Sequence, residues 1–318
     1  MVISLDFLSY VDWKHLQTLD GVSFVPVRGA WGAPPGYLLL KEALASGKFT
    51  ISEVSGAGSV PHLLATNNLD IPVLLMEGEE VIGGKQNRIL NTTVLVAAHA
   101  KVTLPVSCVE RGRWNHASTT HTHSGRIIDK EIRFHKIADM AANPQARRQH
   151  RSDQNLVWQY VDKRLKEERL VSMTDAAYEI YAKRREELMG WKSELTLYDD
   201  QFGFAVLNGT SLIGIELLVP AQKFKAQFDT LIDSYLIELN QLPPATGALT
   251  PGTRDLRALL GESLEESIVQ GVSLGKNVYV VWQKHVGHGL LVDEQLIQFS
   301  ILSGRGEKRR SSAQTART

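Results

Sequence analysis

Cysteine is almost absent from this sequence, which has a single one, Cys108, among 318 residues. One cysteine cannot form an intramolecular disulfide, and no spacing of Cys and His typical of a zinc site is present. These absences exclude a disulfide-stabilised secreted domain and a structural zinc domain. An intracellular, reducing compartment is the simplest interpretation.

An excess of charge and long apolar runs are also missing. The 35 Lys and Arg residues balance the 35 Asp and Glu residues, whereas proteins that bind nucleic acid through its phosphates usually carry a basic excess. The longest apolar runs, such as 94–98, are far shorter than the about 20 residues of a membrane-spanning helix. The first six residues lack the basic and apolar regions of a signal peptide. We therefore expect a cytoplasmic protein that contacts no membrane and does not have nucleic acid as its partner.

What the sequence does contain is 43% hydrophobic residues, enough for a core, in a pattern whose period changes along the chain. From about 21 to 114, short runs of alternating polar and apolar residues predict a mostly antiparallel β sandwich or partial barrel, interrupted by a helix at 37–45. The polar residues 117–126 are expected to form a loop. Helical spacing and capping residues then predict a helical middle segment, with helices at 127–142, from Pro144, at 156–169 and from Ser172 or Thr174 to Met189.

The last third of the chain returns to a period of two. Asn208-Gly209, between alternating runs at 202–207 and 211–219, predicts a β-hairpin because both turn residues must take positive φ. The fold class is therefore α+β, with a C-terminal mixed part that contains this hairpin, a long helix at 221–239, a helix at 253–267 and strands at 277–283 and 298–302. We predict four parts along the chain: a β-rich domain at 1–120, a helical segment at 121–190, an α+β part at 191–303 and a disordered tail at 304–318.

The densest polar cluster runs from Glu77 to Arg88, between two predicted strands. Its two adjacent glycines would let backbone N–H groups approach an anion, while Lys85 and Arg88 suit phosphate contacts. Its carboxylates suit ribose hydroxyls, a cation or acid–base chemistry. A solvated hairpin turn would look similar, and Gly83-Gly84-Lys85 lacks the other residues of a Walker loop. The pattern therefore leaves both a ligand site and an ordinary turn open.

Three other features have ordinary structural explanations that weigh more. Cys108 lies among valines in a predicted strand, as a small buried residue does more often than a nucleophile. His121 and His123 have the spacing of a metal pair but lie in the expected loop without the rigid surroundings of such a site, so no metal is expected. The arginines at 147–151 lie near aromatic residues and could bind RNA, but in a neutral chain they fit a solvated helix face better.

Two long motifs make the sequence resemble a known family. EGEEVIGGKQNRILNTTVLV at 77–96 and PVSCVERGRW at 105–114 are similar to the domain family named for its association with ADP-ribosylglycohydrolases and rhodanese-phosphatases. The resemblance extends from about 21 to 303. It implies a role in NAD or ADP-ribose metabolism, in an ADP-ribosylation or conflict system. It implies no particular reaction, so enzymatic activity and the cofactor are left open.

The first hypothesis that follows is one pocket, built from both motifs, for ADP-ribose or a related phosphorylated nucleotide sugar. The basic residues would hold phosphates, Trp114 would stack on a base, and carboxylates would hold ribose or act as acid and base. The candidate catalytic residues are Glu79, Glu80 and Glu110. The candidate ligand-binding residues are Glu77, Gly83, Gly84, Lys85, Gln86, Asn87, Arg88, Asn91, Arg111, Arg113 and Trp114.

The alternative hypothesis is a non-catalytic structural or protein-interaction module, with a protein partner from an ADP-ribosylation or conflict system. The motif charges would then neutralise one another in a buried network. Its expected signature is Glu77 or Glu80 paired with Arg88 or Arg111, with no open cleft.

Overall fold

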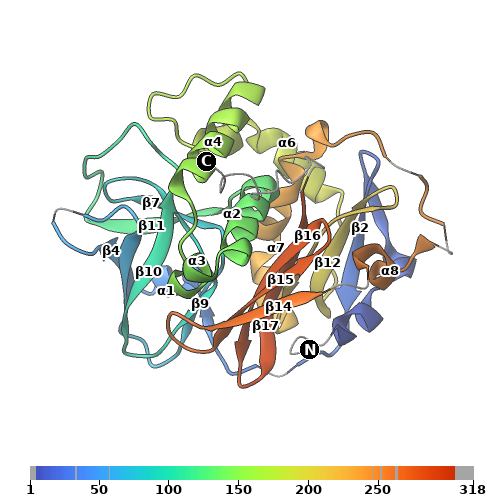
Figure 1. The fold of residues 1–318 in the computed structure, drawn as a ribbon, viewed down its shortest axis with the longest axis horizontal. Helices are drawn as coiled ribbons and strands as arrows, with labels where there is room; N and C mark the ends of the chain where they lie inside the picture. Colours follow the sequence, from blue (N-terminus) through green and yellow to red (C-terminus); the bar gives the residue numbers. More distant parts are fainter. Residues whose placement is uncertain are drawn as a thin grey trace, which may run out of the picture.

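The computed structural model describes residues 5–32, 34–56, 58–245, 247–250, 253–261 and 264–304. A small β-barrel and a large antiparallel sheet lie side by side, with helices packed between and above them (Figure 1). This arrangement confirms the predicted α+β class, with its β-rich N-terminal half and helical middle. In the described part of the chain, no helix has the length and apolar character needed to cross a membrane.

The barrel is closed by six strands in the order β10-β5-β4-β11-β7-β8. Alternate residues of these strands, among them Phe49, Ile51, Leu63 and Leu104, form one buried apolar cluster, as expected where one face of each strand turns inward. The strands are β4 (Phe49–Glu53), β5 (His62–Asn67), β7 (Glu79–Gly83), β8 (Arg88–Leu90), β10 (Lys101–Cys108) and β11 (Thr120–Ile127).

A second, smaller sheet packs against the barrel and extends its apolar cluster. It joins β3 (Leu38–Leu39), β6 (Val73–Leu75) and β9 (Val94–Val96), and β3 leads directly into helix α1 (Leu40–Ala45). The positive φ of Gly47, 70°, lets the chain leave this short helix and enter β4.

The large sheet has eight strands in the order β1-β2-β12-β13-β17-β16-β15-β14. Its first two strands come from the N-terminal part of the chain, and the second of them pairs with β12 of the predicted hairpin, β12 and β13. The strands are β1 (Gln17–Leu19), β2 (Val22–Arg28), β12 (Gln201–Asn208), β13 (Ser211–Leu218), β14 (Glu265–Gln270), β15 (Lys276–Trp282), β16 (His285–Val292) and β17 (Gln295–Ser303).

Helices α2 and α7 fill the space between the barrel and the sheet (Figure 1). Asp129 caps α2 by accepting a hydrogen bond from the N–H of Ile132 at 3.0 Å, so this helix begins three residues later than its apolar spacing predicts. The helices are α2 (Lys130–Ala142), α3 (Pro144–Gln149), α4 (Gln154–Glu167), α5 (Tyr178–Lys183), α6 (Arg185–Ser193), α7 (Ala221–Leu236) and α8 (Leu256–Leu260), with 3-10 turns at Asp6–Tyr10, Trp13–His15 and Leu239–Gln241.

Several elements of local structure were predicted wrongly or not at all. Residues 120–127 of the expected loop form β11, because Thr120 and His121 pair with β4 while residues 121–123 pair with β7. The helix expected at 253–267 is only α8, after which residues 265–270 pair with β15 as β14. Strand β16 was not predicted, since Gly287 and Gly289 interrupt its apolar pattern.

The helix predicted from Ser172 to Met189 is also wrong, because it is divided into α5 and α6 and continues past Gly190. The preceding residues are held in a non-helical form by the end of the second motif: Thr174 accepts a hydrogen bond from the N–H of Gly112, and the N–H of Ala177 donates to the carbonyl of Val109. Tertiary hydrogen bonds therefore outweigh helical propensity there. The predicted disordered tail lies, from 305 onward, outside the described residues.

Candidate functional site

The first motif is divided between two environments at the two ends of β7. Glu77, Glu79 and Glu80 lie where the barrel meets the helices and the large sheet, and all three are buried. Residues 83–88 form the turn from β7 to β8, at the other end of the strand. The two halves of the motif therefore have different partners.

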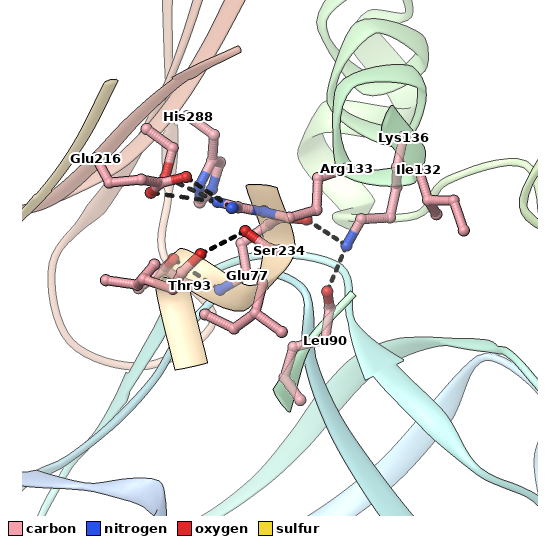
Figure 2. Close-up of polar contacts among 12 residues, drawn as sticks. Glu77, Leu90, Thr93, Ile132, Arg133, Lys136, Glu216, Ser234 and His288 are labelled. Atoms are coloured by element: carbon pink, nitrogen blue, oxygen red, sulfur yellow. Dashed lines mark hydrogen bonds and ion pairs between the residues drawn. The ribbon is translucent and has the colours of Figure 1, made fainter. Parts of the chain in front are cut away.

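Glu77 belongs to a fully buried ionic network that joins the barrel, α2 and the large sheet (Figure 2). Arg133 Nε donates to Glu77 Oε2 at 2.8 Å, and Arg133 Nη1 donates to Glu216 Oε1 at 2.6 Å. Lys136 Nζ lies 2.6 Å from Glu77 Oε1 and also donates to the carbonyl of Leu90. Burial alone would raise the pKa of Glu77, but Lys136 and Arg133 hold it below its usual value. Two carboxylates and two cations neutralise each other, which is a structural arrangement.

Glu79 and Glu80 are the first two residues of β7, the strand that follows Glu77. The oxygens of Glu79 are occupied, since Oε1 accepts from Gln227 Nε2 at 2.8 Å and lies 3.2 Å from His123 Nε2, while Oε2 accepts a backbone N–H. Glu80 differs, because burial raises its pKa to about 7 although Ser124 and nearby cations favour the carboxylate. Within the described residues, no group of three or more His, Cys, Asp or Glu side chains could hold a metal ion.

The other half of the motif contributes to a polar end of the barrel interior. Arg88 of β8 lies directly opposite Cys108 of β10, and His121 of β11 lies opposite Ile51 of β4. Glu53 follows Ile51 by two residues and therefore shares its face of β4. The apolar core thus gives way to four polar or ionisable side chains, which we call the barrel mouth: Glu53, Arg88, Cys108 and His121.

Several buried polar atoms of the barrel mouth lack a hydrogen-bond partner. Arg88 is 0% exposed, and its Nη1 donates to Gln86 Oε1 at 3.0 Å. Among the residues that the structure describes, its Nε and Nη2, together with Glu53 Oε2 and His121 Nδ1, have no hydrogen-bond partner. Nε and Nη2 form one edge of the planar guanidinium, the edge that can bind a carboxylate or phosphate with two parallel hydrogen bonds. Because buried polar groups are nearly always paired, this concentration makes the barrel mouth the candidate site.

The charges of the barrel mouth follow from its burial. Burial lowers the pKa of the Arg88 guanidinium below its usual value, although the Cys108 thiolate and Glu53 would raise it. Burial raises the pKa of Cys108 to about 11 despite the nearby guanidinium. Burial also lowers the pKa of His121, although Glu53 opposes this shift. At neutral pH the site therefore presents a protonated thiol and a neutral imidazole beside Arg88.

The two motifs contact each other around the barrel mouth. Glu110 Oε2 accepts from the N–H of Asn87 at 2.9 Å and from Arg113 Nη2 at 2.6 Å. Arg113 Nη1 in turn donates to the carbonyl of Gly84 at 2.8 Å. The pair Glu110–Arg113 thus holds the turn between β7 and β8. These contacts occupy much of the hydrogen-bonding capacity of the Glu110 and Arg113 side chains.

Trp114 covers the barrel mouth from outside. Its ring centroid lies 5.4 Å from Lys85 Nζ and 5.6 Å from Arg88 Cζ, and the residue is 43% exposed. Below it, Glu53 Oε1 accepts from the N–H of Lys85 at 3.0 Å. Gly84 has φ 50° and must be glycine here, because a Cβ would lie 2.2 Å from His121 Cε1. Packing thus fixes the turn against the barrel interior.

Other candidate residues lie away from the barrel mouth. Arg111 is paired at the surface with Asp162 at 3.1 Å and Asp175 at 2.9 Å. Asn91 Oδ1 accepts from Ser107 Oγ at 2.8 Å on the outer side of β8. Conversely, sequence analysis did not assign Glu53 and His121 to the site. The strict alternation of residues 49–53 could have placed Glu53 on the inner face, but no local pattern distinguishes a strand from a loop around His121.

Two open clefts in the described part of the molecule lie elsewhere. One, of about 570 Å³, lies beside α8 and is lined by Leu260 and Trp282. The other, of about 450 Å³, lies near Trp31 and Phe202. No residue of the two linings has a buried side-chain atom without a hydrogen-bond partner, among the residues described. Neither cleft therefore shows the unmet hydrogen bonding of the barrel mouth.

Comparison with known proteins gives one match. A family model described as ARPP-1, the ARG and Rhodanese-Phosphatase-superfamily-associated Protein domain, matches residues 11–302. No curated protein and no solved structure matches the chain significantly. The matched span includes both motifs, the whole barrel and nearly all of the large sheet.

Proposed function

The chain belongs to the ARPP-1 family, whose description associates the domain with ARG and rhodanese-phosphatase proteins, and on this premise we propose that the barrel mouth binds a phosphorylated nucleotide sugar of the ADP-ribose class. The observation that carries the proposal is the free edge of Arg88, a buried guanidinium with two unpaired donors. A phosphate would accept from both donors and neutralise the buried charge. Hydrogen bonds to charged groups contribute about 1.5–3 kcal/mol each.

Trp114 and Lys85 supply the remaining contacts for such a ligand. Trp114 is partly exposed and covers Arg88 only through its ring contact, so a change of its side-chain conformation would admit a phosphate to the guanidinium. The displaced indole would then stack on the base, which stabilises protein–nucleotide complexes by about 1–3 kcal/mol. Lys85 lies on the same turn and would contact a second phosphate.

Binding, without chemistry, is the function that these contacts support. Glu110 accepts bonds from Arg113 and Asn87, and Glu79 is bonded to Gln227 and His123. These carboxylates are therefore assigned a positioning role. Glu80 titrates near neutral pH, but it shares the other end of β7 with Glu79.

The test uses isothermal titration calorimetry to compare two arginines, Arg88 of the first motif and Arg111 of the second. Wild-type protein is titrated with ADP-ribose, AMP and inorganic phosphate, and so are Arg88→Met and Arg111→Met. Arg111 is the matched control, because its exposed ion pairs contribute little to stability. We expect saturable binding of ADP-ribose to wild type and Arg111→Met, and none to a folded Arg88→Met. Unchanged binding by Arg88→Met would refute the proposal.

A second candidate function is recognition of ADP-ribose attached to a protein. It is favoured by Val171 and Met173, which are 97% and 98% exposed. Their loop is hydrogen-bonded to the second motif, since the carbonyl of Thr174 accepts from the N–H of Gly112. Gly112 lies two residues before Trp114. A Val171→Ser/Met173→Ser variant should bind free ADP-ribose normally but should bind an ADP-ribosylated protein more weakly than wild type does. Equal affinities of the variant and wild type for the modified protein would reject this function.

A further inference from the structure

We propose that Glu53 and His121 bind the two adjacent hydroxyl groups of a ribose, so that the barrel mouth selects a ribose phosphate over phosphate alone. This inference rests on the function proposed above and names the chemical class of its ligand. Neither residue belongs to the two motifs.

The unpaired atoms of the barrel mouth have complementary hydrogen-bonding character. Arg88 Nε and Nη2 are donors, and Glu53 Oε2 is an acceptor. His121 Nε2 lies 3.4 Å from the carbonyl of Gln86 and is the ring atom that can donate to it. Burial lowers the pKa of this imidazole, and in the neutral tautomer with its proton on Nε2, Nδ1 carries a lone pair and is a second acceptor. Two donors match the oxygens of a phosphate, and two acceptors match the O–H groups of a ribose.

The protein holds these acceptors in place before any ligand arrives. Glu53 is oriented through its other oxygen, Oε1, which accepts from the N–H of Lys85 at 3.0 Å. His121 lies against Gly84, where even a methyl group would collide with the ring. Both contacts come from the turn that precedes Arg88, so one structural element positions the donors and the acceptors.

Within the described residues, Glu53 and Arg88 do not form an ion pair with each other, so both can bind a ligand. They influence each other electrostatically, but no ion pair within 4.0 Å joins them in the described structure. A direct ion pair would satisfy both groups and would close the site. Their separation instead leaves the carboxylate oxygen and the guanidinium edge to meet different groups of one ligand.

Loss of one ligand hydroxyl would leave a buried acceptor unpaired. Sites that hydrogen-bond a hydroxyl discriminate strongly against the analogue that lacks it. We therefore expect wild-type protein to bind AMP at least about tenfold more tightly than 2′-deoxy-AMP or 3′-deoxy-AMP. These nucleotides have the same phosphate and base, so their contacts with Arg88 and Trp114 should be equal.

The experiment measures the affinities of AMP and both deoxynucleotides for wild type, Glu53→Gln and Glu294→Gln by calorimetry. Glutamine is isosteric and keeps the oxygen that accepts from Lys85, but it replaces Oε2 by a donor. Glu53→Gln should bind AMP about tenfold more weakly, and it should bind unchanged the one deoxynucleotide that lacks the hydroxyl held by Glu53. Glu294, an exposed carboxylate paired with Lys276 on a distant hairpin, is the control for loss of negative charge and should behave as wild type.

The outcomes distinguish failure of the ribose inference from failure of the proposed nucleotide-sugar binding. Equal binding of AMP and both deoxynucleotides by wild type would overturn the inference and leave phosphate binding by Arg88 standing. Full retention of the AMP preference by Glu53→Gln would also overturn it. Failure of wild type to bind AMP, ADP-ribose or phosphate would overturn the proposed function itself. If Glu53→Gln does not fold, His121→Gln provides the same comparison through the other acceptor.

Discussion

Replacing Arg88 by methionine should leave the ligand-free protein at least as stable as wild type, which is unusual for a fully buried arginine. The side chain is 0% exposed, yet it makes one side-chain hydrogen bond, to Gln86, and one ring contact, with Trp114. Its two remaining donors are unpaired. Methionine has a similar length and fills an apolar space without any polar group that must be satisfied.

The expected change in the free energy of unfolding can be worked out from these contacts. Loss of the charged hydrogen bond and the ring contact costs about 2–4 kcal/mol. Removal of two buried donors without partners returns about 2–6 kcal/mol. The sum favours methionine by about 1 kcal/mol, and the protein should therefore not be destabilised.

Arg133 is the matched control for this prediction, because it is equally buried but fully bonded. It donates to Glu77, Glu216 and Ser300. Arg133→Met would leave two carboxylates without their main partner, which typically costs about 3–5 kcal/mol. The two substitutions change the same residue type to the same replacement, so only the bonding of the guanidinium differs.

Urea denaturation of dialysed, ligand-free protein, followed by circular dichroism, measures both effects. We expect the unfolding midpoint of Arg88→Met to equal or exceed that of wild type, and that of Arg133→Met to fall sharply. If Arg88→Met is destabilised as much as Arg133→Met, Arg88 has a structural role and its free edge does not indicate a ligand site.

Three further predictions concern single side chains. Burial raises the pKa of Glu80 to about 7 from its ordinary 4.5, so the folded protein keeps a proton that the unfolded chain releases. Stability should therefore fall by about 3 kcal/mol as pH rises from 4.5 to 7. Urea midpoints at pH 5 and pH 8 should show this for wild type but not for Glu80→Gln, and equal pH slopes would contradict it. Burial raises the pKa of Cys108 to about 11, so mass spectrometry should show slow alkylation of this thiol by iodoacetamide at pH 7.5. The alkylation should become faster at higher pH and slower when ADP-ribose is added. Rapid alkylation at pH 7.5 would argue against a buried thiol. Trp114→Ala should weaken ADP-ribose binding about tenfold in calorimetry, and undiminished affinity would exclude stacking.

Some parts of the fold could be predicted from the sequence because their signals are local. The Asn208-Gly209 turn specifies its hairpin through backbone conformation alone, and the apolar stripe of α7 is visible within 16 residues. Strand β11 could not be predicted in this way, because its hydrogen bonds go to β4 and β7, which are distant in sequence. Its polar residues give no alternating apolar pattern, so only the closed barrel makes it a strand.

The candidate site shows the same limit. Sequence alone identified the two motifs, and the turn before Arg88 does contact Glu110 and Arg113. It could not show that Glu77 belongs elsewhere, because its partner Arg133 is 56 residues away on another element. Nor could it show that Glu53 lies beside Arg88, since that depends on the closure of the barrel.

The two halves of the first motif are linked through β8, which explains how a structural role and a binding role can belong to one stretch of sequence. Lys136 connects Glu77 to the carbonyl of Leu90, two residues beyond Arg88 on the same strand. The buried network therefore anchors the strand that presents the guanidinium at the barrel mouth. A side chain with unpaired donors binds well only if its backbone cannot move to satisfy those donors within the protein. The buried ionic network before β7 is thus what allows Arg88, on the paired strand β8, to keep its edge free for a ligand.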